Sequence, residues 1–399
     1  MMRGESIVCF AKDWSEDPTS NNHVMKMLAR NNEVLWLNSI GMRTPSLRSG
    51  RDMGKIIAKL KSFAKGPTDV EAGLHVYTPI VLPFPHSRPA QLANGEILKN
   101  TLRVLRSKYR MRPDFQLWTF LPNAVKYVGK LGEAFTVYYC TDEFSKFGYL
   151  DGDKIAAMER ELCERADIVF TTAKTLLERK KAFNPETHLA SHGVDVAHFS
   201  KALDPTCKVP DEIAHLKGPV IGFIGLLEEW VDTDAIAYLA SMRPDWSFVV
   251  IGRAIADVAN LKKPNIHLLG RKPYAELPPY LKRFDVGLIP FRLNELTRNG
   301  NPIKLREYFS AGLPVLSSDI PEVRQYADFE FGDKEGALGC GVYQSHEELL
   351  SLCEKALAAD SPDARARRSR AMQAESWEKK VEAVGAHITR VREAKRARA

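Results

Sequence analysis

Residues 301–318 read NPIKLREYFSAGLPVLSS, a helical pattern followed by a short apolar strand. The pattern predicts a helix that begins after Pro302 and ends at Ala311-Gly312. The first backbone N–H groups of a helix have no intrahelical partner, so a helix start attracts anions. Lys304 adds a positive charge there, and Glu307 lies about one turn further on nearly the same face. Because a carboxylate accepts hydrogen bonds from hydroxyls, the two side chains suit a diphosphate joined to a polyol.

The same lysine and glutamate also fit an ordinary amphipathic helix whose side chains form a solvated ion pair. The position of the segment, directly after an apparent buried strand at 286–289, favours the ligand-binding interpretation. A nucleotide-linked sugar is a ligand that presents both a diphosphate and hydroxyl groups.

Short apolar runs alternate with helical patterns along the chain, which predicts parallel sheets with helices on both faces. In the first half we expect strands at 6–10, 33–38, 74–78, 115–119, 135–140 and 168–172, and helices at 21–30, 89–108, 124–130, 154–166 and 174–181. In the second half we expect strands at 220–224, 247–251, 266–269, 286–289 and 314–317, and helices at 233–242, 274–283, 303–311 and 345–358.

A chain of 399 residues is too long for one ordinary core. We therefore predict an α/β fold of two Rossmann-like domains facing a cleft. The first domain is expected at 1–205 and the second at 206–375. A C-terminal helix and tail follow at 376–399, and packing of that helix back onto the first domain is one arrangement we expect.

Several classes of protein are disfavoured by missing motifs. No Gly-x-Gly-x-x-Gly follows the first strand, which weighs against a dehydrogenase, and no Walker, His-Glu-x-x-His or Gly-x-Ser-x-Gly motif occurs. No zinc-finger, RRM or KH signature points to nucleic acid. The six cysteines lack metal-like spacing, and Cys9 and Cys140 read as reduced core residues of a cytoplasmic protein. No signal peptide or membrane-spanning run is recognisable. We expect no cofactor and no metal.

The basic residues are concentrated in the first half, although the net charge is only +7. One cluster consists of Arg43, Arg48, Arg51, Lys55, Lys59, Lys61 and Lys65. Apolar residues at helical spacing, Ile56, Ile57, Leu60 and Phe63, lie among them. Such a helix can lie on an anionic membrane surface. The alternative, a core helix with a solvated basic face, stays open.

The pattern from Pro302 to Pro314 resembles the donor-binding motif of the GT-B nucleotide-sugar glycosyltransferases, P-x-K-x-x-E-[YF]-x-[AS]-x-G-x-P-V. Four further segments resemble the same donor domain, each at a strand end: Phe223-Ile224-Gly225, Ile251-Gly252-Arg253, Leu269 to Tyr274 and Phe284 to Phe291. The likeness spans roughly residues 218–325. It implies that the donor is bound by Gly225, Gly252, Arg253, Arg271, Pro302, Lys304 and Glu307.

Three positions depart from that family. Retaining members carry a glutamate where this chain has Asn299, and a basic pair where it has Leu226 and Trp230. Lys304, together with Arg253 or Arg292, must then carry the charge of the diphosphate. The segment Ser191 to Asp195 resembles the family's Asn-Gly-Val-Asp junction, and its His192 is a further candidate for contact with the phosphates.

The first domain must supply the catalytic group. The run Tyr138-Tyr139-Cys140-Thr141-Asp142-Glu143 resembles inverting, membrane-associated glucuronosyltransferases of exopolysaccharide assembly, which have a Ser-Asp there. This resemblance implies that Asp142 is the base that takes the proton of the acceptor hydroxyl. Helix capping is the alternative role for Asp142, and Glu143 is a less favoured base. Asp13 and His23 are candidate acceptor contacts.

The expected function is transfer of a sugar, with inversion, from a nucleotide diphosphate donor, expected to be a UDP-sugar, to a polysaccharide or lipid-linked saccharide. The expected location is the cytoplasm, on the inner face of the cell membrane. A GT-B epimerase of the non-hydrolysing type is disfavoured because it needs several carboxylates and histidines in one site. A catalytically degenerate nucleotide-sugar-binding regulator remains the alternative, motivated by Asn299, Leu226 and Trp230.

Overall fold

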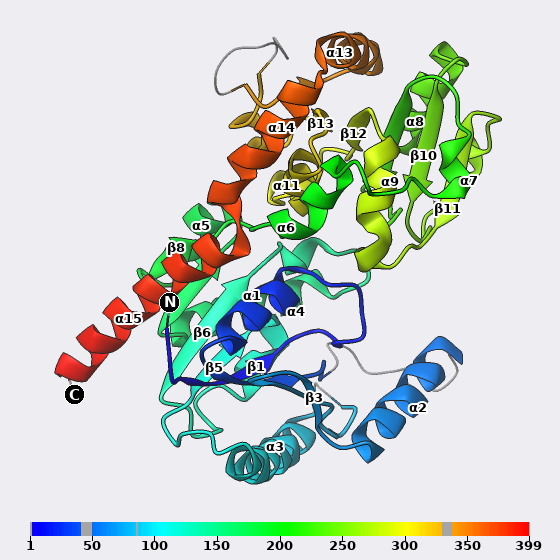
Figure 1. The fold of residues 1–399 in the computed structure, drawn as a ribbon. Coiled ribbons are helices and arrows are strands. Elements are labelled where there is room, and N and C mark those ends of the chain that lie inside the picture. The colour runs from blue at the N-terminus through cyan, green and yellow to red at the C-terminus, as the bar shows by residue number, and fades with distance from the viewer. Residues whose placement is uncertain (1, 41–49, 85–86, 329–336, 399) are drawn as a thin grey trace. The chain divides into compact units, whose positions relative to one another are not determined.

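The computed structural model describes residues 2–40, 50–84, 87–328 and 337–398. The chain forms two compact units (Figure 1): unit 1 contains Met1–Ser191 and Lys380–Ala399, and unit 2 contains His192–Lys379. The division therefore falls earlier than the expected boundary at 205/206. The physical reason is that Val196, Phe199 and Ala202 are buried in a hydrophobic cluster of unit 2.

Unit 1 is built on an eight-stranded sheet with the order β3-β4-β2-β1-β5-β6-β7-β8. Its strands are β1 (Ser6–Phe10), β2 (Glu33–Leu37), β3 (Thr68–Glu71), β4 (Leu74–Tyr77), β5 (Gln116–Thr119), β6 (Phe135–Cys140), β7 (Ile168–Thr171) and β8 (Thr187–Leu189). Its helices are α1 (Ser20–Ala29), α2 (Gly50–Ala64), α3 (Arg88–Lys108), α4 (Gly152–Arg165), α5 (Lys174–Lys181) and the part of α15 (Trp377–Arg398) from Lys380 on. All pairings are parallel except β3 with β4.

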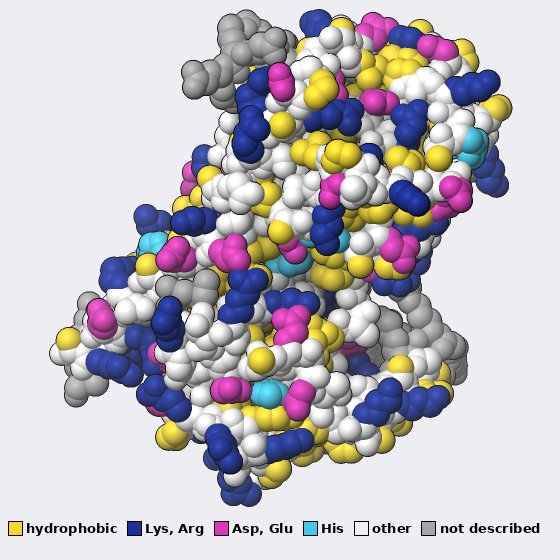
Figure 2. Space-filling model, viewed as in Figure 1, with side chains coloured by type: hydrophobic (Ala, Val, Ile, Leu, Met, Phe, Trp, Pro, Cys, Tyr) yellow, Lys and Arg dark blue, Asp and Glu magenta, His cyan; other side chains and the backbone are white. Residues whose placement is uncertain are grey.

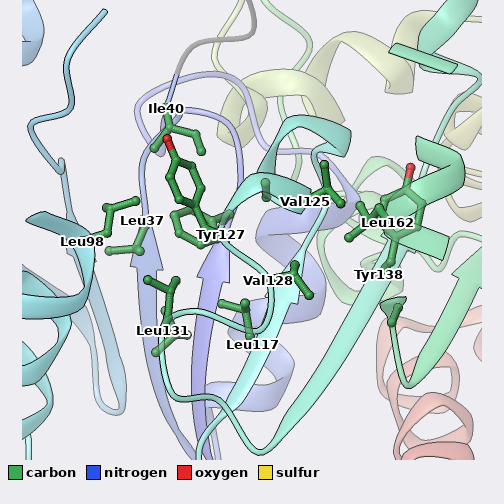
Figure 3. Packing of buried hydrophobic residues seen from close by; sticks show 14 of the residues in the cluster. Leu37, Ile40, Leu98, Leu117, Val125, Tyr127, Val128, Leu131, Tyr138 and Leu162 are labelled. Carbon is green, nitrogen blue, oxygen red and sulfur yellow. The ribbon is translucent and has the colours of Figure 1, made fainter. Parts of the chain in front are cut away.

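The core of unit 1 follows from the alternation of side chains along its strands. Val8 and Phe10 of β1 enter one cluster together with residues of α3 and α4. Figure 3 shows this cluster, with Leu37 of β2 near Leu98 of α3 and Tyr138 of β6 beside Leu162 of α4. The cysteines expected in the core, Cys9 and Cys140, are fully buried.

Unit 2 has a fully parallel six-stranded sheet with the order β11-β10-β9-β12-β13-β14. Its strands are β9 (Val220–Ile224), β10 (Ser247–Ile251), β11 (Ile266–Gly270), β12 (Val286–Ile289), β13 (Val315–Ser318) and β14 (Cys340–Tyr343). Its longer helices are α8 (Thr233–Met242), α9 (Leu277–Arg283), α11 (Ile303–Ser310), α13 (His346–Ala359) and α14 (Pro362–Ala371). This strand order is that of a Rossmann fold, whose ligands bind where the order reverses, here between β9 and β12.

Helices cover both faces of the second sheet. Val220 and Ile224 of β9 pack in one cluster with α9 and α11, whereas Ile221 and Phe223 pack in another with α8 and α13. A sheet buried on both faces explains why its strands read as continuous apolar runs. The α/β class with two Rossmann-like domains is confirmed.

The sequence missed three short strands and misjudged one helix. β3 is a short strand that exposes polar residues, β8 has only 3 residues, and β14 is a run of 4 residues that includes Gly341. The helix expected at 124–130 is a 3-10 turn, Pro122–Lys126, which its proline starts. Before the expected C-terminal helix, α14 is followed by another 3-10 turn, Met372–Glu375, and α15 then begins at Trp377.

Candidate functional site

Three glycines lie at the carboxyl ends of neighbouring strands in unit 2. Gly225 follows β9 and donates its N–H to the carbonyl of Ile251 at 2.9 Å, and Gly252 follows β10 and donates to the carbonyl of Gly270 at 2.8 Å. Gly252 has φ +150°, and a Cβ there would lie 1.7 Å from the carbonyl oxygen of Gly225. No side chain fits at this point, so the sheet edge presents bare backbone, as close approach of a ligand requires.

The donor motif forms the start of α11. Pro302 is the residue before its first turn. Lys304 Nζ lies 2.5 Å from Glu307 Oε2, with 24% of the lysine side chain and only 5% of the glutamate side chain exposed. The interpretation of these residues as a solvated surface pair is therefore wrong. A buried carboxylate with a half-buried cation at a helix start is an arrangement that can exchange its internal contact for a ligand.

Two further motif residues fix the position of α11. The Tyr308 hydroxyl accepts a hydrogen bond from the backbone N–H of Ile224, at the end of β9, at 2.8 Å. The ring of Tyr308 covers Gly287 so closely that a Cβ there would come within 2.6 Å of it. The tyrosine and the glycine thus serve packing, and they hold the helix start at the reversal of strand order.

Arg306 is a buried residue of the site that sequence reasoning missed. It is 1% exposed, and its guanidinium donates to Glu375 at 3.1 Å, to Asn301 at 2.9 Å and to the Tyr326 hydroxyl at 2.9 Å. It therefore holds the loop before α11 in place. Its position is a variable one in the motif, and helix periodicity alone cannot distinguish a buried arginine from an exposed one.

The other candidate cations differ in their surroundings. Arg292 donates to Asp234 at 3.1 Å, so its charge is already compensated. Arg253 is exposed after β10 and forms no ion pair with the described residues. Arg271 is exposed after β11. Of the two arginines proposed to assist Lys304, Arg253 is thus the better placed to meet a phosphate.

Two departures from the family have structural explanations. Asn299 is 3% exposed and donates to the carbonyl of Glu295 at 2.6 Å, so it ends the short helix α10 (Glu295–Arg298). Leu226 is 39% exposed directly after Gly225. His192, also a candidate, is buried beside Trp377, with ring centroids 6.4 Å apart.

Tyr274 is an additional polar residue close to the donor motif. Its ring stacks on His198 at 4.6 Å between centroids, and His198 Nε2 donates to its backbone carbonyl at 2.9 Å. Burial raises the pKa of Tyr274, and the charges of Glu307 and Asp195 raise it further. Its hydroxyl therefore stays protonated near Glu307 and can donate a hydrogen bond.

In unit 1, Asp142 follows β6. Its backbone carbonyl accepts the N–H of Phe144 at 3.0 Å, but its side chain caps no helix: the residue before the 3-10 turn Phe144–Lys146 is Glu143, and Asp151 caps α4. The capping alternative for Asp142 is therefore wrong. Burial raises the pKa of Asp142, partly offset by a hydrogen bond from Thr141. A higher pKa makes the carboxylate a stronger base.

Glu143, the less favoured base, is committed to a buried ion network. It lies 3.6 Å from Lys180 Nζ and 3.4 Å from Arg179, and accepts a hydrogen bond from Ser145 at 2.9 Å. Lys180 in turn contacts Glu159 at 2.6 Å. Burial acts to lower the pKa of Lys180, but the negative charges around it prevail and raise it. The network anchors the loop that carries Asp142 to α4 and α5.

The candidate acceptor contacts lie further along the same sheet edge. Asp13 Oδ1 accepts the N–H of Ser39 at 2.9 Å and its hydroxyl at 2.8 Å, so Asp13 joins the loops after β1 and β2. His23 is buried in the first turn of α1. β5 separates β1 from β6, so the strands that precede Asp13 and Asp142 lie two strand spacings apart, about 10 Å.

The described residues contain neither a cluster of metal-ligating side chains nor a helix suited to crossing a membrane. No three His, Cys, Asp or Glu side chains there come together as a metal ion would require. In the same residues, no helix combines the length and the apolar character needed to cross a membrane.

Residues 218–341 match the family described as Glycosyl transferases group 1. Over 226 residues the chain is 24% identical to the putative teichuronic acid biosynthesis glycosyltransferase TuaH of Bacillus subtilis (strain 168), covering 52% of this chain and 53% of that protein. The chain thus spans about half the length of the curated relative it matches.

Solved glycosyltransferase structures share the whole fold at low identity. Sucrose-phosphate synthase of Thermosynechococcus elongatus superposes with a TM-score of 0.69 at 13% identity, over 98% of this chain and 100% of the other. Anabaena Alr3699/HepE, solved in complex with UDP and glucose, superposes with a TM-score of 0.65 at 11% identity, over 96% and 99%. The fold of this chain is GT-B.

Proposed function

Because residues 218–341 form a group 1 glycosyl transferase domain within a GT-B fold, we propose that the protein is a glycosyltransferase whose unit 2 binds a nucleotide-sugar. The observation that carries this proposal is the paired Lys304 and nearly buried Glu307 at the start of α11. Lys304 and the N–H groups of the first turn of α11 bind the diphosphate, and Glu307 accepts hydrogen bonds from hydroxyls. UDP is the proposed nucleotide, because HepE, a structural neighbour, was solved with UDP and glucose.

The proposed chemistry is direct displacement with inversion. The carboxylate of Asp142 takes the proton of the acceptor hydroxyl while that oxygen forms a bond to the anomeric carbon. The bond from the anomeric carbon to the diphosphate breaks, and the leaving UDP carries the electron pair. Lys304 and the start of α11 stabilise its charge, so the step needs no metal.

The proposed acceptor is a polysaccharide or a lipid-linked saccharide at the inner face of the cell membrane. TuaH, the curated relative, is named for teichuronic acid biosynthesis. In unit 1, helix α2 and residues around it expose apolar and basic side chains, which suits an anionic lipid surface.

The decisive experiment follows UDP release from UDP-sugars by the purified protein in the presence of saccharide acceptors. Turnover that depends on an acceptor supports the proposal. Tight UDP binding without any turnover, over a panel of donors and acceptors, would instead indicate a nucleotide-sugar-binding regulator.

Replacing Lys304 with methionine should raise the dissociation constant of UDP by about one to two orders of magnitude, since a charge-assisted contact is worth roughly 1.5–3 kcal/mol. Calorimetry measures the constant. Lys208→Met, a substitution at an exposed lysine of the same unit, should leave it unchanged. The substitution at Lys304 also leaves the nearly buried Glu307 carboxylate without its cation. The double variant Lys304→Met with Glu307→Gln removes that unpaired charge, so equally weak UDP binding in both variants excludes misfolding as the cause. Unaltered UDP affinity in Lys304→Met would remove the lysine from the site.

Reversing Lys61 and Lys65 to glutamate should weaken binding to phosphatidylglycerol-containing vesicles about 30-fold or more, because each basic residue near such a surface contributes about 1 kcal/mol. Both lysines are exposed, whereas Lys59, predicted from sequence to serve this surface, bonds to Ser39. Arg43 and Arg48 lie outside the described residues.

Co-sedimentation with vesicles measures the effect of this reversal. The matched control, Lys208→Glu with Lys262→Glu, changes the net charge equally on exposed residues of unit 2. Equal losses in the two variants would show that only net charge matters and that the surface around α2 has no special role.

A further inference from the structure

Helix α2 has its apolar side outward and polar contacts inward. Met53, Ile57 and Leu60 follow one face at intervals of four and three residues, and they are 37%, 49% and 52% exposed. On another side, Lys59 and Ser62 hydrogen-bond to the rest of unit 1. The interpretation of α2 as an ordinary core helix with a solvated basic face is therefore wrong, because none of the described residues buries these three apolar side chains.

The charge and apolar character of the neighbourhood indicate what covers this face. The sequence of α2 contains Arg51, Lys55, Lys59 and Lys61 against a single acidic residue, Asp52. Further exposed apolar side chains, Ile80, Leu82 and Phe84, follow the end of β4, to which α2 is tied by the contact of Phe63 with Tyr77. Figure 2 shows hydrophobic and basic side chains beside each other over the region of α2. Apolar residues among lysines match an anionic bilayer better than a neutral protein surface.

The inner contacts of α2 lead to the candidate acceptor loop. Lys59 Nζ donates to the Ser39 hydroxyl at 2.9 Å and to the Ser39 carbonyl. The Ser39 hydroxyl donates to Asp13 Oδ1 at 2.8 Å. α2 is therefore two hydrogen bonds away from Asp13.

A second chain of hydrogen bonds reaches the same loop. The hydroxyls of Ser62 and Thr78 lie 2.6 Å apart, and Asn38 Nδ2 donates to Thr78 Oγ1 at 2.8 Å. Asn38 Oδ1 accepts the backbone N–H of Trp14 at 2.8 Å. The first chain ends on Asp13, which the sequence predicted as an acceptor contact, and the second ends on the neighbouring Trp14.

We propose that α2 docks on an anionic lipid surface and that docking stabilises the loop after β1. The membrane that carries the acceptor thereby holds the acceptor loop in one conformation. A bilayer that holds α2 favours the state in which both hydrogen-bond chains are made. Linkage requires the reverse as well: a ligand that favours the same loop state tightens membrane binding by the same factor. That the loop binds a saccharide rests on the proposed function; the response of the loop to lipid does not.

Hydrogen exchange of the full chain tests the response without donor or acceptor. The probes are vesicles of phosphatidylcholine alone and of phosphatidylcholine with phosphatidylglycerol. The reporting amides are those of Trp14, Glu16 and Ser39. The Trp14 amide donates to Asn38, and the amides of Glu16 and Ser39 both donate to Asp13. We expect their exchange to slow about 5-fold or more on anionic vesicles only, because a typical coupling free energy between two sites changes an equilibrium by that factor.

Two variants separate docking from its transmission. Ile57→Ser with Leu60→Ser removes the apolar face and should abolish both sedimentation with vesicles and the slowed exchange. Asp13→Ala with Ser62→Ala removes the carboxylate that Ser39 contacts and the hydroxyl that contacts Thr78, and it alters no basic or apolar residue of α2. It should bind vesicles like the wild type and lose the slowed exchange at Trp14 and Glu16.

Each other outcome overturns the proposal. Failure of the wild type to bind anionic vesicles, or self-association through this face in sedimentation equilibrium, removes the lipid as partner. Vesicle binding with unchanged exchange at the three amides removes the coupling. Full protection of Trp14 and Glu16 in Asp13→Ala with Ser62→Ala removes the hydrogen-bond chains as its route. If the lipid response holds while UDP-sugar turnover is never found, the glycosyltransferase proposal alone fails.

Discussion

Replacing Asp142 with asparagine should lower the turnover number by about 10²–10⁴, the usual contribution of a positioned general base. The asparagine keeps the shape of the carboxyl group but cannot accept the proton of the acceptor hydroxyl. UDP affinity should stay within about twofold, a change far below the effect on turnover, because Asp142 belongs to unit 1 and the nucleotide site to unit 2. Steady-state kinetics together with calorimetry measure both quantities.

The same substitution should also stabilise the protein at neutral pH. Burial raises the pKa of Asp142 above its ordinary value near 3.8, so the folded state binds this proton more tightly than the unfolded state. The wild type therefore loses stability as the pH rises through the raised pKa, whereas the asparagine variant does not. Thermal unfolding should show the variant to be more stable at neutral pH, with a difference that narrows as the pH falls towards 4.

Asp151→Asn is the matched control, because Asp151 caps α4 and asparagine caps a helix equally well. It should change neither turnover nor stability. Full activity in Asp142→Asn would identify Asp142 as structural and move suspicion to Asp13 or His23. Retention of the donor's anomeric configuration in the product, read from NMR coupling constants, would contradict direct displacement.

Replacing Lys180 with methionine should reduce the free energy of unfolding by about 3–5 kcal/mol, as breaking a buried ion pair does. The substitution leaves Glu159 and Glu143 without their shared cation, and both side chains are almost fully buried. The pKa of Lys180 is raised, so the lysine contributes its stability below its ordinary pKa and loses it only as the pH rises through the raised value. The deficit of the variant should therefore be constant across neutral pH and shrink only at strongly alkaline pH.

Chemical denaturation measures this change. Lys181→Met, at the exposed neighbouring position, should cost little. Adding Glu159→Gln to Lys180→Met should recover part of the loss, because one buried charge no longer lacks a partner. An unaltered denaturation midpoint in Lys180→Met would show that the network does not anchor the Asp142 loop.

The donor motif shows how much of the structure could be predicted from local sequence. Pro302, Lys304 and Glu307 could be placed at a helix start, because a proline and a helical period are local signals. All strands except β3, β8 and β14 could be predicted within a residue or two, since strands buried on both faces read as continuous apolar runs. The strand-end glycines Gly225 and Gly252 were also found, because every parallel strand must end before its helix begins.

What each polar side chain does was settled only by the fold. Whether Lys304 and Glu307 are solvated, whether Glu143 is free or paired with Lys180, and whether Arg306 is exposed or buried depend on residues distant in sequence. The same holds for α2: its sequence determined that it is amphipathic, but the direction of its apolar face could not be predicted. Periodicity depends on neighbours along one helix, whereas burial and ion pairing depend on what the rest of the chain packs against it.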